Sequence, residues 1–270
     1  MSADQAEMKR TRRSQTAATT DSFTAPLSRV GEREVEALLS LHGSPEHGGP
    51  IQKFYSCCRA AASIAFLWLF LCSSAVAEKG FIPLLKGESL DTWIYVGEGP
   101  NGYSVQDGIL ICPAEEKGNL FTRTEYSDFV LGFEFRLEEG GNNGVAIRSP
   151  LRKDAHLTGM EIQILDDQAP RYKDIVQPVQ YHGSIYGVVP AKRGFLKKAG
   201  EWNLQEIRAE GRHIRVTLNG TVIVDADLGA VTDPEILSEH LGLQRSQGHI
   251  GFLGHSSRVE FRNMRIKELP

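Results

Sequence analysis

The chain has 270 residues, and its 30 Lys and Arg against 34 Asp and Glu give a formal net charge of −4 at pH 7. This near-neutral balance excludes the clustered basic surface that a nucleic-acid-binding protein needs. Charged residues make up 24% and hydrophobic residues 41% of the chain, which is ordinary for a globular domain. That composition excludes disorder along the whole length.

The N-terminal part of the chain differs from the rest. Residues 1–52 are rich in Ser, Thr, Ala and Arg and lack sustained periodicity, so we expect a disordered extension or a misassigned start. Residues 53–77 combine a basic flank, an apolar core and a small-residue ending, which is typical of a secretory signal peptide. Because a membrane span needs about 20 apolar residues, this core is short for one. We therefore predict cleavage after Ala77 and a periplasmic or extracellular protein, with an uncleaved anchor as the alternative.

Residues 78–270 have the pattern of one all-β domain. Short stretches alternate apolar and polar residues, and Gly, Asn and Asp clusters separate them. A helix is predicted at 233–241, where Asp233 is a suitable cap and Pro234 suits the first position. The predicted strands lie on either side of Asp107-Gly108 within 103–112 and at 129–136, 145–148, 160–165, 213–218, 221–225, 248–253 and 258–267. This pattern indicates a sandwich of antiparallel sheets with one short helix.

Two turns are specific enough to predict pairing. Asn219-Gly220 separates two alternating stretches, and this pair suits the positive φ angles of a tight hairpin. Asn219-Gly-Thr221 is also a glycosylation sequon, but the turn explains these residues sufficiently. Residues 140–144, rich in Gly and Asn, predict a turn from the strand at 129–136 into a returning strand at 145–148.

Alternation also predicts a polar face. Successive side chains of a strand point to opposite faces, so each strand has an apolar face and a polar one. If the strands at 129–136, 145–148 and 160–165 are neighbours, their polar residues form one floor: Glu134, Arg136, Arg148, Glu161 and Gln163. The floor is either a solvated outer face or a hydrogen-bonding surface suited to sugar hydroxyls or carboxylates.

Other chemistries have little support after residue 77. The sequence contains no phosphate-binding loop, dinucleotide fingerprint, paired-His helix or Cys-x-x-Cys motif there, and its single cysteine, Cys112, forms no internal disulfide. Asp166-Asp167 ends a predicted strand, where a turn cap is favoured over a calcium site. His182, His249 and His255 lie in Gly-bearing segments where a site could form.

Motifs spread over residues 81–269 resemble the 3-keto-disaccharide hydrolase domain family, which is typical of secreted proteins of planctomycetes and Bacteroides. The motifs occur in family order: Phe81 to Trp93, Ser127 to Arg136, Asn142 to Arg148, Gly159 to Asp166, Gly183-Ser-Ile-Tyr-Gly187, Gly200-Glu-Trp-Asn203, Leu218-Asn-Gly220 and Phe261 to Ile266. One departure is Leu253-Gly254-His255, where many members have Leu-Gln-Asp-His.

The resemblance implies a concanavalin-like jelly roll that cleaves glycosides already oxidised at C3 by an upstream dehydrogenase. A C3 ketone acidifies the C2 hydrogen, so a base can form an enolate and the C1 substituent can leave by elimination. Such a site needs a base, a group that stabilises the enolate oxygen, and an acid. Our hypothesis assigns Glu161 or His182 as base, Arg148 or Arg136 to the oxyanion, and Glu134 or His255 as acid.

Further expectations concern ligands and partners. The residues expected to bind substrate are Arg136, Asn142, Gln163, Asp166, Tyr186 and Arg262. No cofactor is required by the sequence, although a divalent metal held by carboxylate and His could replace an arginine. We expect a carbohydrate substrate, no nucleic acid, and membrane contact only during export. The alternatives to an enzyme are a non-catalytic carbohydrate-binding module on the same fold and a cell-surface interaction protein.

Overall fold

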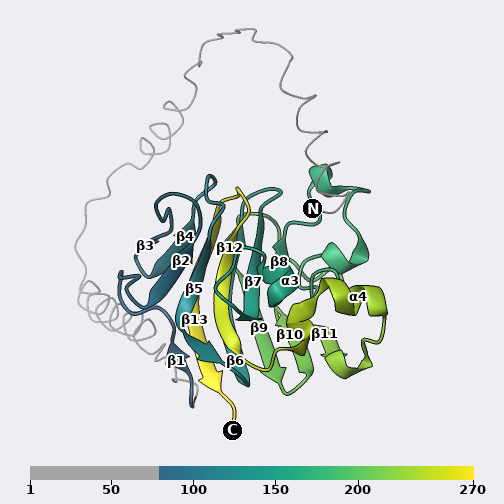
Figure 1. The fold of residues 1–270 in the computed structure, drawn as a ribbon. Coiled ribbons are helices and arrows are strands. Elements are labelled where there is room, and N and C mark those ends of the chain that lie inside the picture. The colour runs from purple at the N-terminus through teal and green to yellow at the C-terminus, as the bar shows by residue number, and fades with distance from the viewer. Residues whose placement is uncertain (1–78) are drawn as a thin grey trace, which may run out of the picture. The chain divides into compact units, whose positions relative to one another are not determined.

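The computed structural model describes residues 79–270, and the predicted extension at 1–52 and signal peptide at 53–77 lie outside this range. The described residues form two antiparallel β-sheets that pack face to face (Figure 1). The all-β sandwich fold is therefore confirmed. None of the helices within residues 79–270 is long and apolar enough to cross a membrane.

The sheets differ in size. The large sheet has the strand order β11-β10-β9-β6-β13-β4-β3, with β1 also paired to β13, and the small sheet has the order β2-β5-β12-β7-β8. The strands are β1 (Ile82–Pro83), β2 (Trp93–Val96), β3 (Ser104–Gln106), β4 (Ile109–Cys112), β5 (Asn119–Tyr126), β6 (Phe129–Leu137), β7 (Asn142–Ser149), β8 (Met160–Leu165), β9 (Asn203–Glu210), β10 (His213–Leu218), β11 (Thr221–Asp227), β12 (Gly248–Gly254) and β13 (Val259–Glu268).

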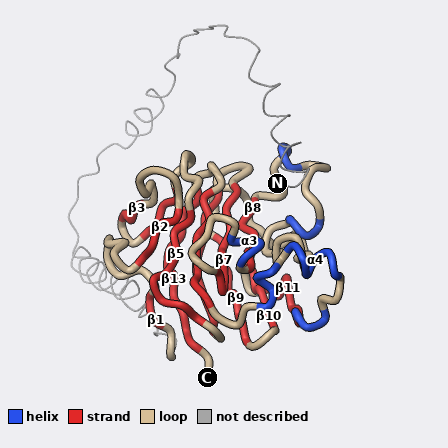
Figure 2. The backbone as a smooth tube through the Cα atoms, in the orientation of Figure 1, coloured by secondary structure: helices blue, strands red, loops and turns tan. Residues whose placement is uncertain are grey.

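Consecutive strands repeatedly cross between the sheets, as in a jelly roll. The chain passes from β4 in the large sheet to β5 in the small one, then to β6 in the large sheet and β7 in the small one. The predicted return of 145–148 alongside 129–136 is therefore wrong, because β6 pairs with β9 and β13 while β7 pairs with β8 and β12. Figure 2 shows these crossings as loops at the ends of the strands.

Both tight hairpins are confirmed. Asp107 and Gly108 have φ angles of 51° and 73° between β3 and β4, and Asn219 and Gly220 have 49° and 86° between β10 and β11. The Asn219 side chain is also used, because its Nδ2 donates hydrogen bonds to the Phe195 carbonyl (2.8 Å) and Asn203 Oδ1 (2.9 Å). The sequon asparagine is thus part of the turn's own hydrogen bonding.

The described helices are short. The predicted helix is α4 (Pro234–Glu239), and Asp233 caps it by accepting a hydrogen bond from the Glu235 amide. A second helix, α3 (Ala155–Thr158), was not predicted, because a single turn leaves no periodicity to detect. The 3₁₀ helices are η2 (Pro170–Tyr172), η3 (Pro178–Gln180), η4 (Leu228–Ala230) and η5 (Leu241–Gln244).

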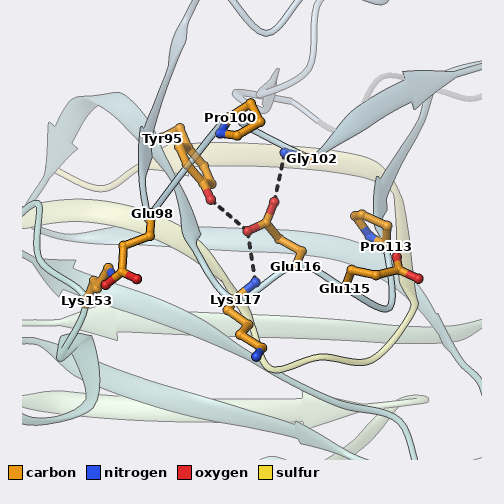
Figure 3. Close-up of a pocket in the computed structure, with 9 residues that line it drawn as sticks. All are labelled: Tyr95, Glu98, Pro100, Gly102, Pro113, Glu115, Glu116, Lys117 and Lys153. Atoms are coloured by element: carbon orange, nitrogen blue, oxygen red, sulfur yellow. Dashed lines mark hydrogen bonds and ion pairs between the residues drawn. The ribbon is translucent and has the colours of Figure 1, made fainter.

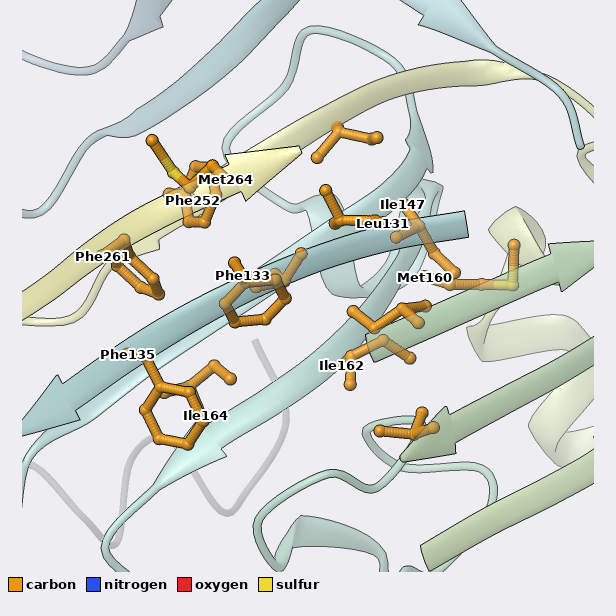
Figure 4. Close-up of a cluster of buried hydrophobic side chains, with 14 of the residues drawn as sticks. Leu131, Phe133, Phe135, Ile147, Met160, Ile162, Ile164, Phe252, Phe261 and Met264 are labelled. Atoms are coloured by element: carbon orange, nitrogen blue, oxygen red, sulfur yellow. The ribbon is translucent and has the colours of Figure 1, made fainter. Parts of the chain in front are cut away.

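The main core lies between the two sheets (Figure 4). The large sheet contributes Phe133, Phe135 and Phe261, all fully buried, and the small sheet contributes Ile162 and Phe252. Because alternate residues on these strands are apolar, each sheet places its polar residues on the face turned away from the other sheet, here called its outer face. The sandwich therefore has two separate outer faces.

Candidate functional site

The predicted polar floor does not exist as one surface. Glu134 and Arg136 lie on β6, on the outer face of the large sheet, whereas Glu161 and Gln163 lie on β8, on the outer face of the small sheet. The hydrophobic core separates the two groups. Our assignment of Glu134 and Arg136 to a site shared with Glu161 is therefore wrong. Alternation identified the polar face of each strand correctly but not the sheet to which the strand belongs.

On the large sheet, the polar residues neutralise one another. Arg262 on β13 pairs with Glu134 (Nη2–Oε2, 2.7 Å), and Arg136 on β6 pairs with Glu260. Burial acts to raise the pKa of Glu134, but hydrogen bonds from Arg262 and Asn263 outweigh it and lower the pKa. Arg136 and Glu260 therefore form one ion pair and Arg262 and Glu134 another, so these charges are paired within the large sheet, and the substrate-binding roles expected of Arg136 and Arg262 stay predictions.

Arg148 also has a role other than the predicted one. It is the last residue but one of β7 and has a φ of 48°, and its side chain turns into the protein, where the residue is only 1% exposed. Its guanidinium donates to the carbonyls of Ser127 (2.8 Å) and Gly211 (2.6 Å) and to the Asp128 carboxylate (2.8 Å). Arg148 thus ties the connection between β5 and β6, and the turn between β9 and β10, to the end of a small-sheet strand.

His182 lies inside the sandwich rather than in a solvent-accessible site. Nδ1 accepts a hydrogen bond from the Leu165 amide (3.2 Å), so Nε2 carries the proton and donates to Gln205 Oε1 (3.0 Å). Its ring stacks on Phe135 with 5.0 Å between centroids. Burial lowers the pKa of His182 to about 4, so the ring is neutral at physiological pH. This geometry is that of a core histidine, and the proposed role as base is wrong.

Asp166 caps a turn. Its Oδ2 accepts a hydrogen bond from the Gly140 amide (2.9 Å), and neighbouring Asp167 accepts one from the His182 amide (3.1 Å). Both carboxylates are buried, and Arg193 pairs with Asp167. The pair therefore holds together the loops beyond β8, as the turn-cap interpretation predicts, and the substrate-binding role expected of Asp166 stays a prediction.

The remaining predicted residues meet on the outer face of the small sheet, at β8. The registers align side chains in two rows across the sheet. One row runs Val96, Asn119, Leu253, Gly144 and Gln163, and the next runs Ile94, Phe121, Gly251, Ala146 and Glu161. Apart from Asn119, whose side chain donates to the Arg152 and Lys153 carbonyls, the rows are apolar or small over most of the sheet, and they carry an ionisable group only at β8.

Glu161 is the centre of this group, here called the β8 cluster: Glu161, Gln163, His255, Tyr186, His156 and His240. Glu161 is only 4% exposed, and its Oε1 lies 3.6 Å from Nε2 of His255, whose side chain is 40% exposed. The Gln163 amide is satisfied when its nitrogen faces Glu161 Oε1 (3.1 Å) and the Asn143 carbonyl (3.0 Å). A buried carboxylate is thereby held against an imidazole that reaches solvent.

A glycine makes room for the carboxylate. A Cβ on Gly144 would lie 2.1 Å from Glu161 Oε1, so the carboxyl group occupies the space that a side chain on β7 would take. Gly144 lies opposite Gln163 in the register, between β12 and β8. Asn142, two residues before Gly144, lies on the same face, and its side-chain amide lies beside that of Gln163. The Asn142-Asn-Gly144 sequence therefore shapes the floor under Glu161.

Tyr186 reaches the β8 cluster on a segment that runs along the edge of β8. The backbone amide of Tyr186 donates to the Glu161 carbonyl (2.9 Å), and the backbone amide of Gln163 donates to the Ser184 carbonyl (3.0 Å). The Tyr186 hydroxyl accepts a hydrogen bond from Gln180 Nε2 (3.1 Å). These bonds fix the Gly183-Ser-Ile-Tyr-Gly187 motif beside Glu161.

Sequence reasoning missed two histidines of the cluster. His156 on α3 packs edge-on against Tyr186, with 5.8 Å between ring centroids, and His240 Nδ1 donates to the His156 carbonyl (3.1 Å). Burial lowers the pKa of His156, Glu161 acts in the opposite direction, and His240 and His255 lower it further. No spacing in the sequence links these histidines, because the packing of η5 against α3 brings them together.

The cluster does not form a metal site. Within residues 79–270, no set of three or more His, Cys, Asp and Glu side chains converges in a way that could hold a metal ion. The residues present therefore do not fit the divalent metal considered from the sequence, and we derive no step through one. The available chemistry is proton transfer between a carboxylate and imidazoles, supported by neutral hydrogen-bond donors.

The fold and the β8 cluster together define a jelly-roll sandwich with an acid–base group on the outer face of one sheet. Residues 80–267 match the model of the 3-keto-alpha-glucoside-1,2-lyase-like domain, and the chain belongs to this family. A Bacteroides thetaiotaomicron protein named 3-keto-disaccharide hydrolase is 22% identical over 232 residues, which cover 72% of this chain and 80% of that protein.

Solved structures agree with this placement. A Parabacteroides distasonis protein, described provisionally as a glycosyl hydrolase, is 30% identical with a TM-score of 0.62, and the match covers 70% of this chain and 99% of that one. A second structure from the same organism, with the same provisional description, is 22% identical with a TM-score of 0.61, covering 71% and 95% of the two chains. The likeness thus extends over nearly the full length of both relatives.

Proposed function

We propose that the protein cleaves 3-keto-glycosides at the β8 cluster, by removal of the C2 proton and elimination at C1. The observation that carries the proposal is the buried carboxylate of Glu161, 3.6 Å from the partly exposed imidazole of His255. Family membership and the relative named 3-keto-disaccharide hydrolase support this substrate class.

In this proposal, Glu161 is the base. Its carboxylate takes the C2 proton, and the C–H electron pair forms the enolate of the C3 ketone. Because His156 has a lowered pKa, its imidazole is neutral and can donate a hydrogen bond to the enolate oxygen without carrying a charge itself. Gln163 holds Glu161 in place through its amide nitrogen.

His255 is the proton donor to the leaving group. Collapse of the enolate forms the C1–C2 double bond and breaks the bond from C1 to the glycosidic oxygen, which accepts a proton from His255. The 40% exposure of this side chain suits contact with a departing alcohol and with solvent. Water can then add at C1, with a proton returning to C2, so the net result is hydrolysis.

The proposal places the enzyme outside the cytoplasm, after export directed by residues 53–77 and cleavage after Ala77. It also requires an earlier oxidation at C3 of the glycoside, because an unoxidised sugar lacks the acidic C2 hydrogen. A dehydrogenase acting on the same sugars is therefore the expected supplier of substrate.

The test is incubation of the protein with methyl 3-keto-α-glucoside in deuterated water. We expect cleavage with deuterium at C2 of the product, and no reaction of unoxidised methyl α-glucoside. Glu161→Gln should lower kcat by about 10²- to 10⁴-fold, the usual contribution of a general base. Glu134→Gln, a matched change on the other sheet, is the control.

Two outcomes contradict the proposal. Cleavage to the hydrated 3-keto sugar without deuterium at C2 would indicate an ordinary glycosidase route, whereas the unhydrated elimination product, which has no hydrogen at C2, would still support the proposal. Saturable sugar binding without any product, retained with reduced affinity in Glu161→Gln, would identify a non-catalytic carbohydrate-binding module.

A further inference from the structure

A second polar feature lies at the same end of the small sheet as the β8 cluster. It is a cavity of about 630 Å³, here called the β2 pocket, near the opposite edge of the sheet (Figure 3). Its lining residues are Tyr95, Glu98, Pro100, Gly102, Pro113, Glu115, Glu116, Lys117 and Lys153. The proposed chemistry of the β8 cluster uses none of them.

A fixed carboxylate forms the inner wall of this pocket. Glu116 is 7% exposed, and its oxygens accept hydrogen bonds from the Tyr95 hydroxyl (2.8 Å) and the amides of Gly102 (2.8 Å), Lys117 (2.9 Å) and Gly118 (2.6 Å). Burial and the hydrogen bond to Glu116 raise the pKa of Tyr95 to about 12, so its hydroxyl stays protonated. These bonds give the pocket a defined shape.

The rim carries exposed charges of both signs. Lys153 pairs with Glu98 (2.7 Å) on one side, and both side chains are at least half exposed. Glu115 and Lys117 are exposed residues of the loop that carries Glu116, and Pro100 and Pro113 add apolar surface. Exposed carboxylates and ammonium groups beside apolar surface offer both acceptors and donors, which suits a neutral polyhydroxylated ligand rather than an anion.

The walls of the pocket continue directly into the β8 cluster. The Ser256 amide donates to the Glu116 carbonyl (2.9 Å), and the Gly254 amide donates to the Gly118 carbonyl (3.0 Å), so the pocket loop holds both neighbours of His255. On the other side, Asn119 Nδ2 donates to the Lys153 carbonyl (3.2 Å), three residues before His156. Both connecting segments therefore end at a residue of the cluster.

The separation suits a ligand longer than one sugar ring. Glu116 lies three residues before the start of β5, Glu161 lies on β8, and the strand order between them is β5-β12-β7-β8. Neighbouring strands are about 4.8 Å apart, so three spacings give about 14 Å between the strands that carry the two features. His255 lies between them, on the turn that follows β12.

We propose that the β2 pocket binds the leaving sugar of a 3-keto-disaccharide while the β8 cluster holds the oxidised ring. This inference rests on the proposed function and goes beyond it, because it assigns the second half of the substrate. The departing glycosidic oxygen then lies next to His255, which supplies its proton. The pocket selects a neutral sugar as leaving group and makes no contact with the oxidised ring.

The test compares 3-keto-trehalose with methyl 3-keto-α-glucoside, whose leaving group is too small to reach the pocket. The variant Lys117→Ala/Lys153→Ala removes the rim donors, and Lys192→Ala/Lys198→Ala, also exposed, is the matched control. We expect kcat/KM for 3-keto-trehalose to fall about tenfold through KM, as for loss of charged hydrogen bonds to a ligand. For the methyl glycoside it should stay within about twofold of wild type.

A second variant and a binding measurement keep the inference independent of turnover. Pro100→Trp, at an exposed position, should obstruct the pocket and reproduce the selective loss. Titration with D-glucose, followed by backbone amide shifts, should give saturable changes at Tyr95, Lys117 and Lys153 that Pro100→Trp abolishes.

Equal losses on both substrates, or no loss on either, would overturn the leaving-sugar assignment. So would D-glucose shifts confined to residues outside the pocket. If the wild-type protein cleaves neither substrate, the proposed function fails, and the D-glucose titration still decides whether the pocket binds sugar.

Discussion

Replacing Gly144 by alanine tests whether the position of the Glu161 carboxylate limits the proposed cleavage of 3-keto-glycosides. The added Cβ would lie 2.1 Å from Oε1, 2.6 Å from Cδ and 2.8 Å from Cγ of Glu161. Ordinary van der Waals contact begins at 3.4 Å, so the carboxylate must move by about 1.3 Å. Gly144 is not among the residues with positive φ, so alanine fits the backbone and the clash falls on the side chain.

A displacement of this size predicts a loss of about 100-fold in kcat, because misplacement by about 1 Å has that effect on positioned reactions. The assay is turnover of methyl 3-keto-α-glucoside, with thermal unfolding measured in parallel. Gly132→Ala on β6 is the matched control, since the atoms nearest its Cβ would be those at the end of the Arg265 side chain, from 3.3 Å. Wild-type kcat in Gly144→Ala, with Glu161→Gln inactive, would refute the argument that carboxylate placement matters.

Three further predictions concern residues that the structure places outside the β8 cluster. Arg148→Ala should lower the free energy of unfolding by about 3–5 kcal/mol, because it removes a buried partner of Asp128 and of two carbonyls. Chemical denaturation measures this loss, and a stable but inactive variant would contradict the prediction. Glu134→Gln should leave kcat within about twofold of wild type, since its carboxylate binds Arg262 and Asn263 on the large sheet; a large loss would place it in the site after all. Burial lowers the pKa of His182 from 6.5 to about 4, so the folded protein holds this ring neutral at a pH where the unfolded chain protonates it. The contribution of His182 to the free energy of unfolding is therefore complete above pH 6.5 and is lost as pH falls toward 4, by up to about 3 kcal/mol. Denaturation at several pH values should show this decrease, and His182→Gln should make it shallower; the same slope in both proteins would show that another group is responsible.

Local features of the fold could be predicted because short-range physics determines them. The Asp107-Gly108 and Asn219-Gly220 turns need positive φ, which few other residues adopt at low cost, and both hairpins occur as expected. The strand at 160–165 was predicted with its observed bounds, because its alternation has a buried face on the core. The one-turn helix α3 has no such periodicity, and neither its residues nor His156 could be found from the pattern.

The arrangement of strands into sheets could not be predicted by alternation. A period of two residues gives the same pattern whether the next strand returns alongside or crosses to the other sheet. Residues 138–141 make that crossing between β6 and β7, so Glu134 and Glu161 lie on opposite outer faces. The pairing of Glu161 with His255, Gln163 and Tyr186 was partly predicted, because the family motifs include these residues. His240 became part of the cluster only through the packing of η5 on α3.

The segment that carries Tyr186 has a consequence for solubility. β8 is the last strand of the small sheet, and residues 183–186 occupy its hydrogen-bonding edge through contacts with Glu161 and Gln163. An uncovered edge strand can recruit strands of other molecules and start aggregation. Opening this segment to admit a bulky ligand would therefore expose a strand edge that can pair with other molecules. Entry of substrate from above the sheet avoids this exposure and leaves the segment in place as a wall beside Glu161.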